Sequence, residues 1–242
     1  MKLKVLDLFS GIGGFSLGLE ATNYFETVAF CEIDKYCQKI LRKHWSDVPI
    51  FEDIKKLNGK ELPKIDVITG GYPCQPFSVA GKQKAEQDPR YLWTEYFRLI
   101  KELRPTWVIG ENVSGHIKLG LDTVLTNLES EGYSTRTFSI SASSVGANHK
   151  RERIWILGYS KSKQSCSKNN SPKQGKASEE KQVKFRGNCG GEMWKSNWLF
   201  EPDMDRVAHG LPETMDRLKC LGNAVVPYIP FLIGECIGKI NS

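Results

Sequence analysis

A cysteine in a proline-stiffened loop is the first residue of this chain whose surroundings could support chemistry. Cys74 lies in the segment Gly-Gly-Tyr-Pro-Cys-Gln-Pro-Phe-Ser, which runs from Gly70 to Ser78. The apolar run Ile65 to Thr69 before it predicts a buried parallel strand, and open α/β sheets place their chemistry beyond the carboxyl ends of such strands. Prolines fix φ and remove backbone donors, which holds a neighbouring side chain in one pose. Cys74 is therefore either a buried structural thiol, the common case for an intracellular cysteine, or a nucleophile.

An acid follows the next predicted strand. Glu111 comes in a glycine-led loop after the apolar run Thr106 to Ile109. No histidine lies at a matching strand end to serve as a base, which disfavours a protease-like pair with Cys74. A thiolate can instead attack carbon 6 of a pyrimidine if N3 is protonated at the same time, and carbon 5 then becomes nucleophilic. With a methyl sulfonium as electrophile, the two residues would suit methyl transfer to a pyrimidine.

The first turn of the chain could bind a nucleoside-like cofactor. Glycines stand at positions 11, 13, 14 and 18. The third position of the dinucleotide fingerprint is Ser16, which argues against a pyrophosphate cradle for NAD or FAD. Glu32, at the end of the second predicted strand, could accept ribose hydroxyls, and Asp53, after a third short run, could accept from an adenine amino group. On these residues alone, a plain structural turn remains the alternative.

Alternating elements position these residues. Strands are predicted at 3–9, 27–31, 65–69 and 106–109, with helices after the first turn and from about residues 34, 92 and 121. This alternation predicts an α/β domain with a doubly wound, mostly parallel sheet. Strands at 135–142 and 153–159 follow one another without a helix and predict an antiparallel finish, and an apolar helix is predicted at 228–240. We expect a catalytic and cofactor-binding domain at 1–159, a short, poorly ordered basic insertion at 160–205, and a returning segment at 206–242.

Composition narrows the class of protein. The 242 residues carry a net charge of +6, and residues 160–187 hold seven Lys and one Arg against two Glu, so this segment accounts for the whole excess. It would either meet the phosphates of a partner or form a solvated linker. Seven cysteines without a C-x-x-C pair predict reduced thiols and no metal site. The lack of an 18-residue apolar run and of a signal-peptide pattern predicts a cytoplasmic protein without a membrane partner.

Six motifs, in order, resemble those of the cytosine-5 DNA methyltransferases, in particular the compact phage and restriction-modification type. The stretch Asp7 to Gly14 resembles the family's first cofactor motif, Pro73-Cys74-Gln75 its nucleophile motif and Glu111-Asn112-Val113 its base-binding motif. Glu32 with Ile33, and Asp53, are similar to its ribose and adenine contacts. His149-Lys150-Arg151-Glu152-Arg153 resembles the Gln-x-Arg-x-Arg motif, and Gly222 to Pro227 the motif that returns to the cofactor pocket. The resemblance covers nearly the whole chain except about 160–193.

The resemblance implies a Rossmann-like class I methyltransferase fold, S-adenosylmethionine as cofactor, and a cytosine flipped out of double-stranded DNA as substrate. The catalytic residues it implies are Cys74 as nucleophile, Glu111 at N3, and Arg151 and Arg153, which would orient Glu111, the base or its phosphate. The cofactor residues it implies are Asp7, Phe9, Ser10, Gly11, Gly13, Gly14, Glu32, Ile33, Asp53, Asn223 and Val225. The substrate residues are Pro73, Gln75, Ser78 and Asn112, and residues 80–90 would form a loop that closes over DNA.

Two departures from the family pattern affect the substrate. His149 stands where the family has Gln, which changes one hydrogen bond near the base. The interval between the arginine motif and the last motif is short for a module that reads base edges, so we expect a short or relaxed recognition sequence. Methylation of cytosine in tRNA and a non-catalytic DNA-binding role remain the alternatives. We expect a monomer, with a cognate restriction endonuclease as a candidate partner.

Overall fold

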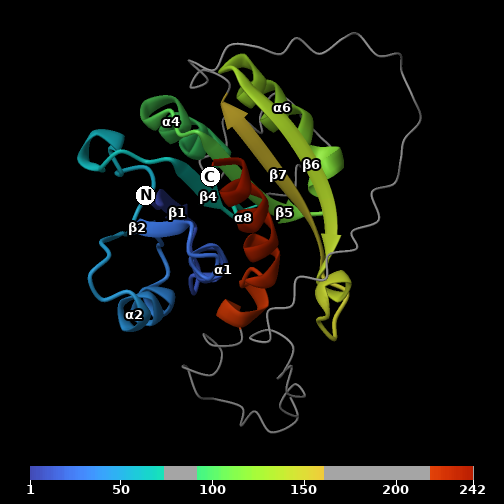
Figure 1. Ribbon diagram of the computed structural model, residues 1–242, viewed down its shortest axis with the longest axis horizontal. Helices are drawn as coiled ribbons and strands as arrows, with labels where there is room; N and C mark the ends of the chain where they lie inside the picture. The colour runs from blue at the N-terminus through green and yellow to red at the C-terminus, as the bar shows by residue number, and fades with distance from the viewer. Residues whose placement is uncertain (74–91, 161–218, 242) are drawn as a thin grey trace, which may run out of the picture.

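The structure is a computed structural model that describes residues 1–73, 92–160 and 219–241 (Figure 1). Three predicted site residues, Cys74, Gln75 and Ser78, lie outside the described residues. The predicted closing loop at 80–90 and all but the first residue of the predicted insertion at 160–205 also lie outside them. The proposed domain boundaries therefore stay predictions.

A seven-stranded sheet in the order β3-β2-β1-β4-β5-β7-β6 forms the centre of the molecule. Its strands are β1 (Leu3–Leu8), β2 (Phe25–Cys31), β3 (Ile50–Phe51), β4 (Val67–Gly70), β5 (Trp107–Val113), β6 (Tyr133–Ser141) and β7 (Glu152–Ser160). Strands β1 to β5 pair in parallel, whereas β7 pairs antiparallel with both β5 and β6. The predicted mostly parallel sheet with an antiparallel finish is confirmed.

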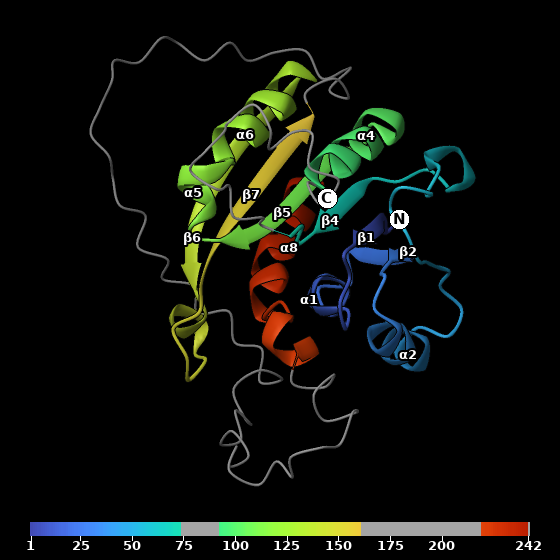
Figure 2. The same ribbon diagram turned by 180° about the vertical axis from the view of Figure 1, so that it is seen from behind.

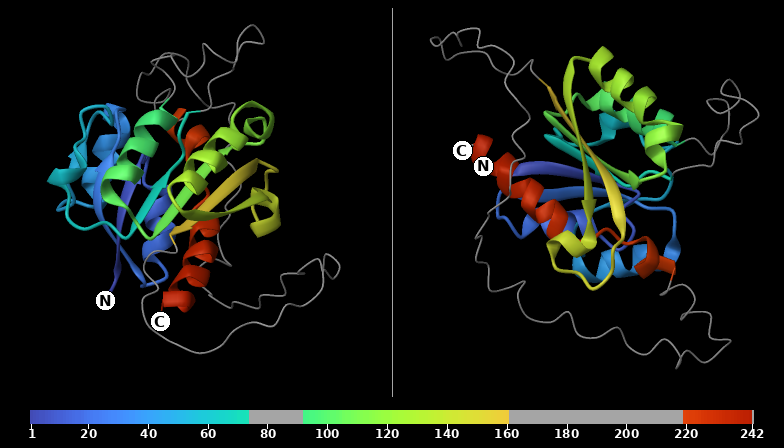
Figure 3. Two further views of the ribbon diagram at one scale, coloured as in Figure 1. Left: turned by 90° about the horizontal axis from the view of Figure 1, so that it is seen from above. Right: turned by 90° about the vertical axis from the view of Figure 1, so that its right-hand side faces the viewer.

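Helices cover both faces of this sheet. They are α1 (Gly14–Glu20), α2 (Lys35–His44), α4 (Trp93–Leu103), α5 (His116–Leu119), α6 (Leu121–Ser130) and α8 (Tyr228–Asn241). Alternate residues of β1 supply the two cores, since Val5 packs with the side chains of α1 and α8 and Leu6 with those of α4 and α6. Figure 3 shows α8 on one side of the sheet and α4 and α6 on the other. The expected doubly wound arrangement follows from these two covered faces.

The switch in strand order places the two motifs of interest side by side. From β1 the chain moves outward to β2 and β3, and then crosses back to β4 on the other side of β1. The turn after β1 and the loop after β4 therefore leave the sheet at neighbouring carboxyl ends, with Leu8 opposite Gly70 in the register. Open α/β sheets bind their ligands in the crevice at such a switch point.

Strand β5 is longer than its sequence pattern predicted. The sequence placed Glu111 in a loop after a strand ending at Ile109, but β5 runs through Glu111 to Val113. The extension is held by pairing with β7, where Glu111 lies opposite Trp155 and Val113 opposite Arg153. The prediction that Glu111 lies in a loop was wrong. It placed the end of the strand before Gly110, whereas pairing with the distant strand β7 continues the strand beyond this glycine. A short helix that was not predicted, α5, follows β5 and leads into α6 (Figure 2).

The segment 219–241 is the one described stretch that is long and apolar enough to cross a membrane, by length and composition only. In the fold, its helix α8 packs against α1 and places Ile229, Ile233 and Ile237 in the core beneath the sheet. Core helices of soluble proteins meet the same length and composition test. The packing of α8 therefore explains its apolar character without a bilayer.

Candidate functional site

A cavity of about 850 Å³ opens at the carboxyl ends of the parallel strands. Ten of the predicted site residues line it: Phe9, Gly11, Glu32, Ile33, Pro73, Glu111, Asn112, Arg151, Arg153 and Asn223. They come from the turn after β1, the residues that follow β2, the loop after β4, strand β5, strand β7 with the residue before it, and the segment before α8. Predicted cofactor residues and predicted base-binding residues thus share one cavity.

The first turn is shaped by backbone that most residues avoid. Phe9 has φ 52° and Gly11 has φ 53°, both in the left-handed region. A non-glycine residue held there is strained, and such strain gathers at ligand sites. The turn is fixed by Glu32, whose Oε2 accepts from the Gly11 N–H at 2.7 Å while its Oε1 accepts from the Asp34 N–H at 2.7 Å. Glu32 therefore couples the turn after β1 to the end of β2 and still has lone pairs facing the cavity.

Asp53 and Ile33 line a second cavity of about 480 Å³, which shares Phe9, Glu32, Ile33 and Pro73 with the first. The Ile33 side chain is 74% exposed, an unusual state for a large apolar group that borders two cavities. Such a side chain offers an apolar surface to a flat ring, while the carboxylate of Asp53 offers an acceptor. The pair is suited to hold an aminopurine.

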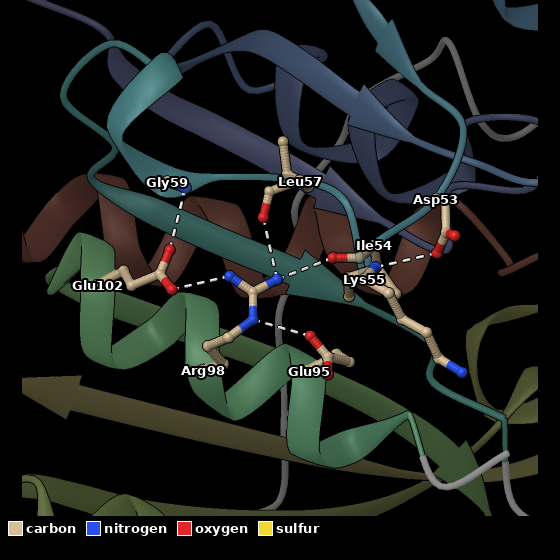
Figure 4. A network of polar contacts seen from close by, with 8 residues as sticks. All are labelled: Asp53, Ile54, Lys55, Leu57, Gly59, Glu95, Arg98 and Glu102. Carbon is tan, nitrogen blue, oxygen red and sulfur yellow. Dashed lines mark hydrogen bonds and ion pairs between the residues drawn. The ribbon is translucent and has the colours of Figure 1, made fainter. Parts of the chain in front are cut away.

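An arginine that sequence reasoning missed fixes the loop that carries Asp53. Arg98 of α4 donates from Nη2 to the carbonyls of Ile54 and Leu57, each at 2.9 Å. Figure 4 shows its guanidinium between Glu95 and Glu102, with which it forms ion pairs of 2.8 Å each. In the sequence Arg98 resembles any charged residue on a helix surface. Its role depends on carbonyls more than 40 positions away, which no local pattern indicates.

At the other end of the cavity, Glu111 and Arg153 form an ion pair. Arg153 Nε lies 3.1 Å from Glu111 Oε1, and their side chains are only 22% and 12% exposed. They meet because Glu111 and Arg153 project from neighbouring antiparallel strands, two positions out of direct register. Burial raises the pKa of Glu111 above its usual value, although Arg153 and Arg151 act in the opposite direction. A carboxyl with a raised pKa keeps its proton to a higher pH than an ordinary glutamate does, which is a property of general acids.

Arg151 connects the cavity to the returning segment. Its Nη1 donates to the carbonyl of Gly222, next to Asn223. Arg151 has φ 21°, outside the region that L residues usually adopt. The structure thus joins two predicted motifs that lie 71 positions apart.

The loop that leads to Cys74 begins in a buried hydrogen-bond network. Asn112 Nδ2 donates to the Tyr72 carbonyl at 3.1 Å, and the Tyr72 hydroxyl lies 2.8 Å from His116 Nε2. Burial lowers the pKa of His116 to about 4, so the imidazole is neutral near pH 7. Its tautomer decides which of the two groups donates in the hydrogen bond with the tyrosine hydroxyl. Tyr72 and His116 were not predicted as site residues, because they act through the backbone of the loop. A tyrosine and a histidine 44 positions apart give no sequence signal.

Asp7 does not line either cavity. It is fully buried, its Oδ2 accepts from the Ser16 hydroxyl at 2.7 Å and its Oδ1 from the Thr69 hydroxyl at 2.9 Å. Burial raises the pKa of Asp7 to about 7, against the opposing effect of both hydroxyls. Asp7 therefore joins β1, α1 and β4 beneath the cavity, and its predicted contact with a cofactor stays a prediction.

The other predicted cofactor residues outside both cavity linings are Ser10, Gly13, Gly14 and Val225. The Ser10 hydroxyl donates to the Asp7 carbonyl at 2.6 Å, within the turn. A Cβ on Gly14 would lie 2.6 Å from the Val225 carbonyl oxygen, and one on Gly18 would lie 2.1 Å from that of Pro227. These two glycines allow the returning segment to pack on α1 at backbone distance, which is a structural role beside any contact with a ligand.

Comparisons with known proteins identify the relatives of this chain. The family model for C-5 cytosine-specific DNA methylase matches residues 3–204. The Type II methyltransferase M1.ScrFI of Lactococcus lactis subsp. cremoris is 40% identical over 163 residues, which cover 65% of this chain and 42% of that protein. The orphan methyltransferase M.SPRI of Bacillus phage SPR is 38% identical over 165 residues, which cover 65% of this chain and 38% of that protein. The chain thus spans about two fifths of the length of these curated relatives.

Solved structures show the same fold. A protein assigned as a DNA modification methyltransferase encoded within an E. coli prophage aligns with TM-score 0.56 and 29% identity, over 66% of this chain and 47% of its own. The S. pombe Dnmt2 methyltransferase aligns with TM-score 0.58 and 23% identity, over 66% of this chain and 51% of its own, a likeness of fold alone. The sheet is therefore of the Rossmann-like class I methyltransferase type. Matched by the family model over most of its length, the chain belongs to the C-5 cytosine-specific DNA methylase family.

Proposed function

We propose that this chain transfers a methyl group from S-adenosylmethionine to carbon 5 of cytosine in DNA, through a covalent bond to Cys74. The observation that carries the proposal is the shared cavity. Glu32, Ile33 and Asn223 line its cofactor side, while Pro73, next to Cys74, and Glu111 line its base side. One cavity could therefore hold a methyl donor and a flipped base together.

The residues of the cofactor side fit S-adenosylmethionine. The strained first turn brings the Gly11 backbone close to the cavity, and Glu32 keeps acceptor capacity for ribose hydroxyls. The exposed Ile33 would cover one face of the adenine, and Asp53 would accept from its amino group. Cavities of about 300–1,000 Å³ are the usual size for such ligands. When bound, S-adenosylmethionine supplies an electrophilic methyl group.

On the base side, Glu111 would donate a proton to, or share one with, N3 of the cytosine. This makes carbon 6 open to attack by the Cys74 thiolate, and the electrons that move into the ring make carbon 5 nucleophilic. The raised pKa of Glu111, caused by burial, supports this role because it favours the protonated form that can deliver a proton. Arg153 orients Glu111 through their ion pair, and its positive charge would favour the thiolate form of Cys74.

The test is a covalent adduct. With S-adenosylmethionine and duplex DNA that contains 5-fluorocytosine, the protein should form a complex that survives denaturation, because fluorine at carbon 5 blocks the elimination that releases the enzyme. Cys74→Ser should abolish the adduct. The matched control Cys236→Ser, an exposed cysteine on α8, should keep it. An adduct that persists in Cys74→Ser would contradict the assignment of the nucleophile.

Methyl incorporation from labelled S-adenosylmethionine should be compared between duplex DNA and tRNA. We expect incorporation into DNA, and equal or greater incorporation into tRNA would favour the RNA alternative. The absence of both incorporation and adduct would favour a non-catalytic DNA-binding protein. Bisulfite sequencing of DNA from an expressing host should show methylation at a short or relaxed sequence. Methylation confined to one long site would contradict the expected short recognition sequence.

The remaining parts of the proposal concern the setting. We place the protein in the cytoplasm and expect it to be a monomer. Light scattering coupled to size exclusion would test the monomeric state. The names of its relatives include both Type II and orphan methyltransferases. We propose a cognate restriction endonuclease in the host, and the test is cleavage of unmethylated but not methylated DNA by host extract.

A further inference from the structure

Two cysteines from distant parts of the chain meet at the edge of the cavity. Cys37 lies in the first turn of α2 and Cys220 in the helical residues 219–223. Their sulfur atoms are 2.8 Å apart, although 183 positions separate them in the sequence. Both side chains are almost fully buried from solvent, at 4% and 5% exposed, yet both border the 850 Å³ cavity. Neither residue has a part in the methyl transfer proposed above.

A third group stands beside this pair but is already engaged. Asp34 lies near enough to both sulfur atoms to complete a cluster of metal-ligand type. However, its Oδ1 accepts from the backbone N–H groups of Tyr36 and Cys37, and its Oδ2 accepts from Lys219 Nζ at 3.2 Å. The positive charge of Lys219 also opposes a cation at this position. The two sulfur atoms are therefore better placed to react with each other than to bind a metal ion.

We propose that Cys37 and Cys220 form a site of reversible oxidation, whose disulfide would tie the returning segment to α2 at the cofactor side of the cavity. A small disulfide such as oxidised glutathione is the oxidant. One thiolate attacks it, which forms a mixed disulfide and releases the first glutathione thiolate. The second protein thiolate then attacks the mixed disulfide, which forms the Cys37–Cys220 bond and releases the second glutathione. Two protons and two electrons leave the protein, and the oxidant becomes two thiols.

The surroundings indicate how this site would behave. Burial raises the pKa of both thiols, so exchange at this site should be slow. The hydrogen bond between the two sulfur atoms lowers the pKa of Cys220 and raises that of Cys37, and the charge of Lys219 lowers the pKa of Cys220 further, so Cys220 is expected to attack first. Because both residues line the cavity, a ligand in the cavity should shield them from an oxidant. Cytosolic disulfides of this reversible kind usually serve as redox sensors.

The bond would hold two walls of the cavity together. Ile33 and Asp34 lead into α2 on one side, and Asn223 follows Cys220 on the other. If a ligand leaves by separation of these walls, the disulfide should slow its departure. This expected effect depends on the cofactor proposed above, whereas formation of the disulfide does not.

The first experiment maps the disulfide in the whole native protein. The reduced chain is incubated with oxidised glutathione, its remaining thiols are alkylated, and the digest is analysed by mass spectrometry. We expect a peptide that joins Cys37 to Cys220 and that dithiothreitol separates. Cys37→Ser and Cys220→Ser should each abolish it, while Cys236→Ser should retain it. Both thiols alkylated, or found only as glutathione adducts, would overturn the proposal.

The second experiment measures release of S-adenosylhomocysteine from the oxidised and reduced protein by stopped flow. We expect release to be slower by about threefold or more after oxidation, with no change in Cys220→Ser. An unchanged rate in protein that carries the mapped disulfide would overturn the effect on the cavity walls. Failure of the reduced protein to bind S-adenosylhomocysteine would instead contradict the proposed cofactor, while the mapped disulfide would stand.

Discussion

The buried carboxyl of Asp7 should make the stability of this protein depend on pH in a direction opposite to that of most acids. Its pKa is raised from 3.8 to about 7, because burial in the centre of the fold disfavours the charged form. The folded protein therefore holds this proton more tightly than the unfolded chain. The contribution of Asp7 to stability is fully present below pH 3.8, declines as the pH rises, and has been lost once the pH exceeds about 7.

The size of this effect follows from the shift. A rise from 3.8 to about 7 corresponds to about 4 kcal/mol at 1.36 kcal/mol per pKa unit. Between about pH 5 and pH 8, roughly 2.5 kcal/mol of that amount should be lost. Asp7→Asn keeps the shape of the side chain without the charge, and the hydroxyls of Ser16 and Thr69 can turn to accept from its amide. The variant should therefore lack this part of the pH dependence.

Urea unfolding of the wild-type protein and Asp7→Asn over this pH range provides the measurement. The difference in free energy of unfolding between them should shift by roughly 2.5 kcal/mol in favour of the variant as the pH rises from about 5 to 8. Asp47→Asn, which removes an exposed carboxyl, serves as the matched control. Parallel curves for the wild type and Asp7→Asn would refute the reasoning, because they would mean that Asp7 has the same proton affinity in both states.

Three further substitutions test the site. Glu111→Gln should slow methyl transfer by about a hundredfold or more, because it removes the proton donor. Unchanged binding of S-adenosylhomocysteine, measured by calorimetry, would locate the loss in catalysis. A near-normal rate of methyl transfer would contradict the role of Glu111 as proton donor. Arg98→Ala should lower the free energy of unfolding by about 1–3 kcal/mol and weaken cofactor binding, because Arg98 fixes the loop that carries Asp53. Lys101→Ala on the same helix is the control. If Arg98→Ala and the control bind the cofactor with equal affinity, Arg98 does not act on the site through this loop. Gly18→Ala should destabilise the fold by about 1–3 kcal/mol, since the added Cβ would lie 2.1 Å from the carbonyl oxygen of Pro227. Thermal melting should show no comparable loss of stability for Gly115→Ala, because a Cβ at that position would meet no atom within 4 Å.

Much of the fold could be predicted because its signals are local. The alternation of apolar strands with amphipathic helices predicted the order of elements, and α4 (Trp93–Leu103) begins close to residue 92, where a helix was expected. The main error, the early end assigned to β5, arose because a glycine normally weakens a strand. Here the hydrogen bonds to β7 outweigh that local preference. Strand ends set by a distant partner are not encoded near the strand itself.

The candidate site divides in the same way. Residues that would touch a ligand lie in recognisable motifs, and ten of them line one cavity. Residues that support them do not, since Arg98 acts on carbonyls and His116 on a tyrosine hydroxyl. The sequence also does not show which acidic residues are buried. Asp7 was predicted to contact the cofactor, but its side chain is fully buried. Such supporting groups become visible only when the packing is known.

The wall formed by residues 219–241 has a consequence for how the protein is made. Its helix α8 covers Phe15, Leu19 and Phe25, which are synthesised well before it. Until that helix is synthesised, these side chains remain exposed on a growing chain, where chaperones or proteases can bind them. The cavity wall that carries Asn223 is missing during the same interval. The cavity should therefore be complete only after residues 219–241 have been synthesised.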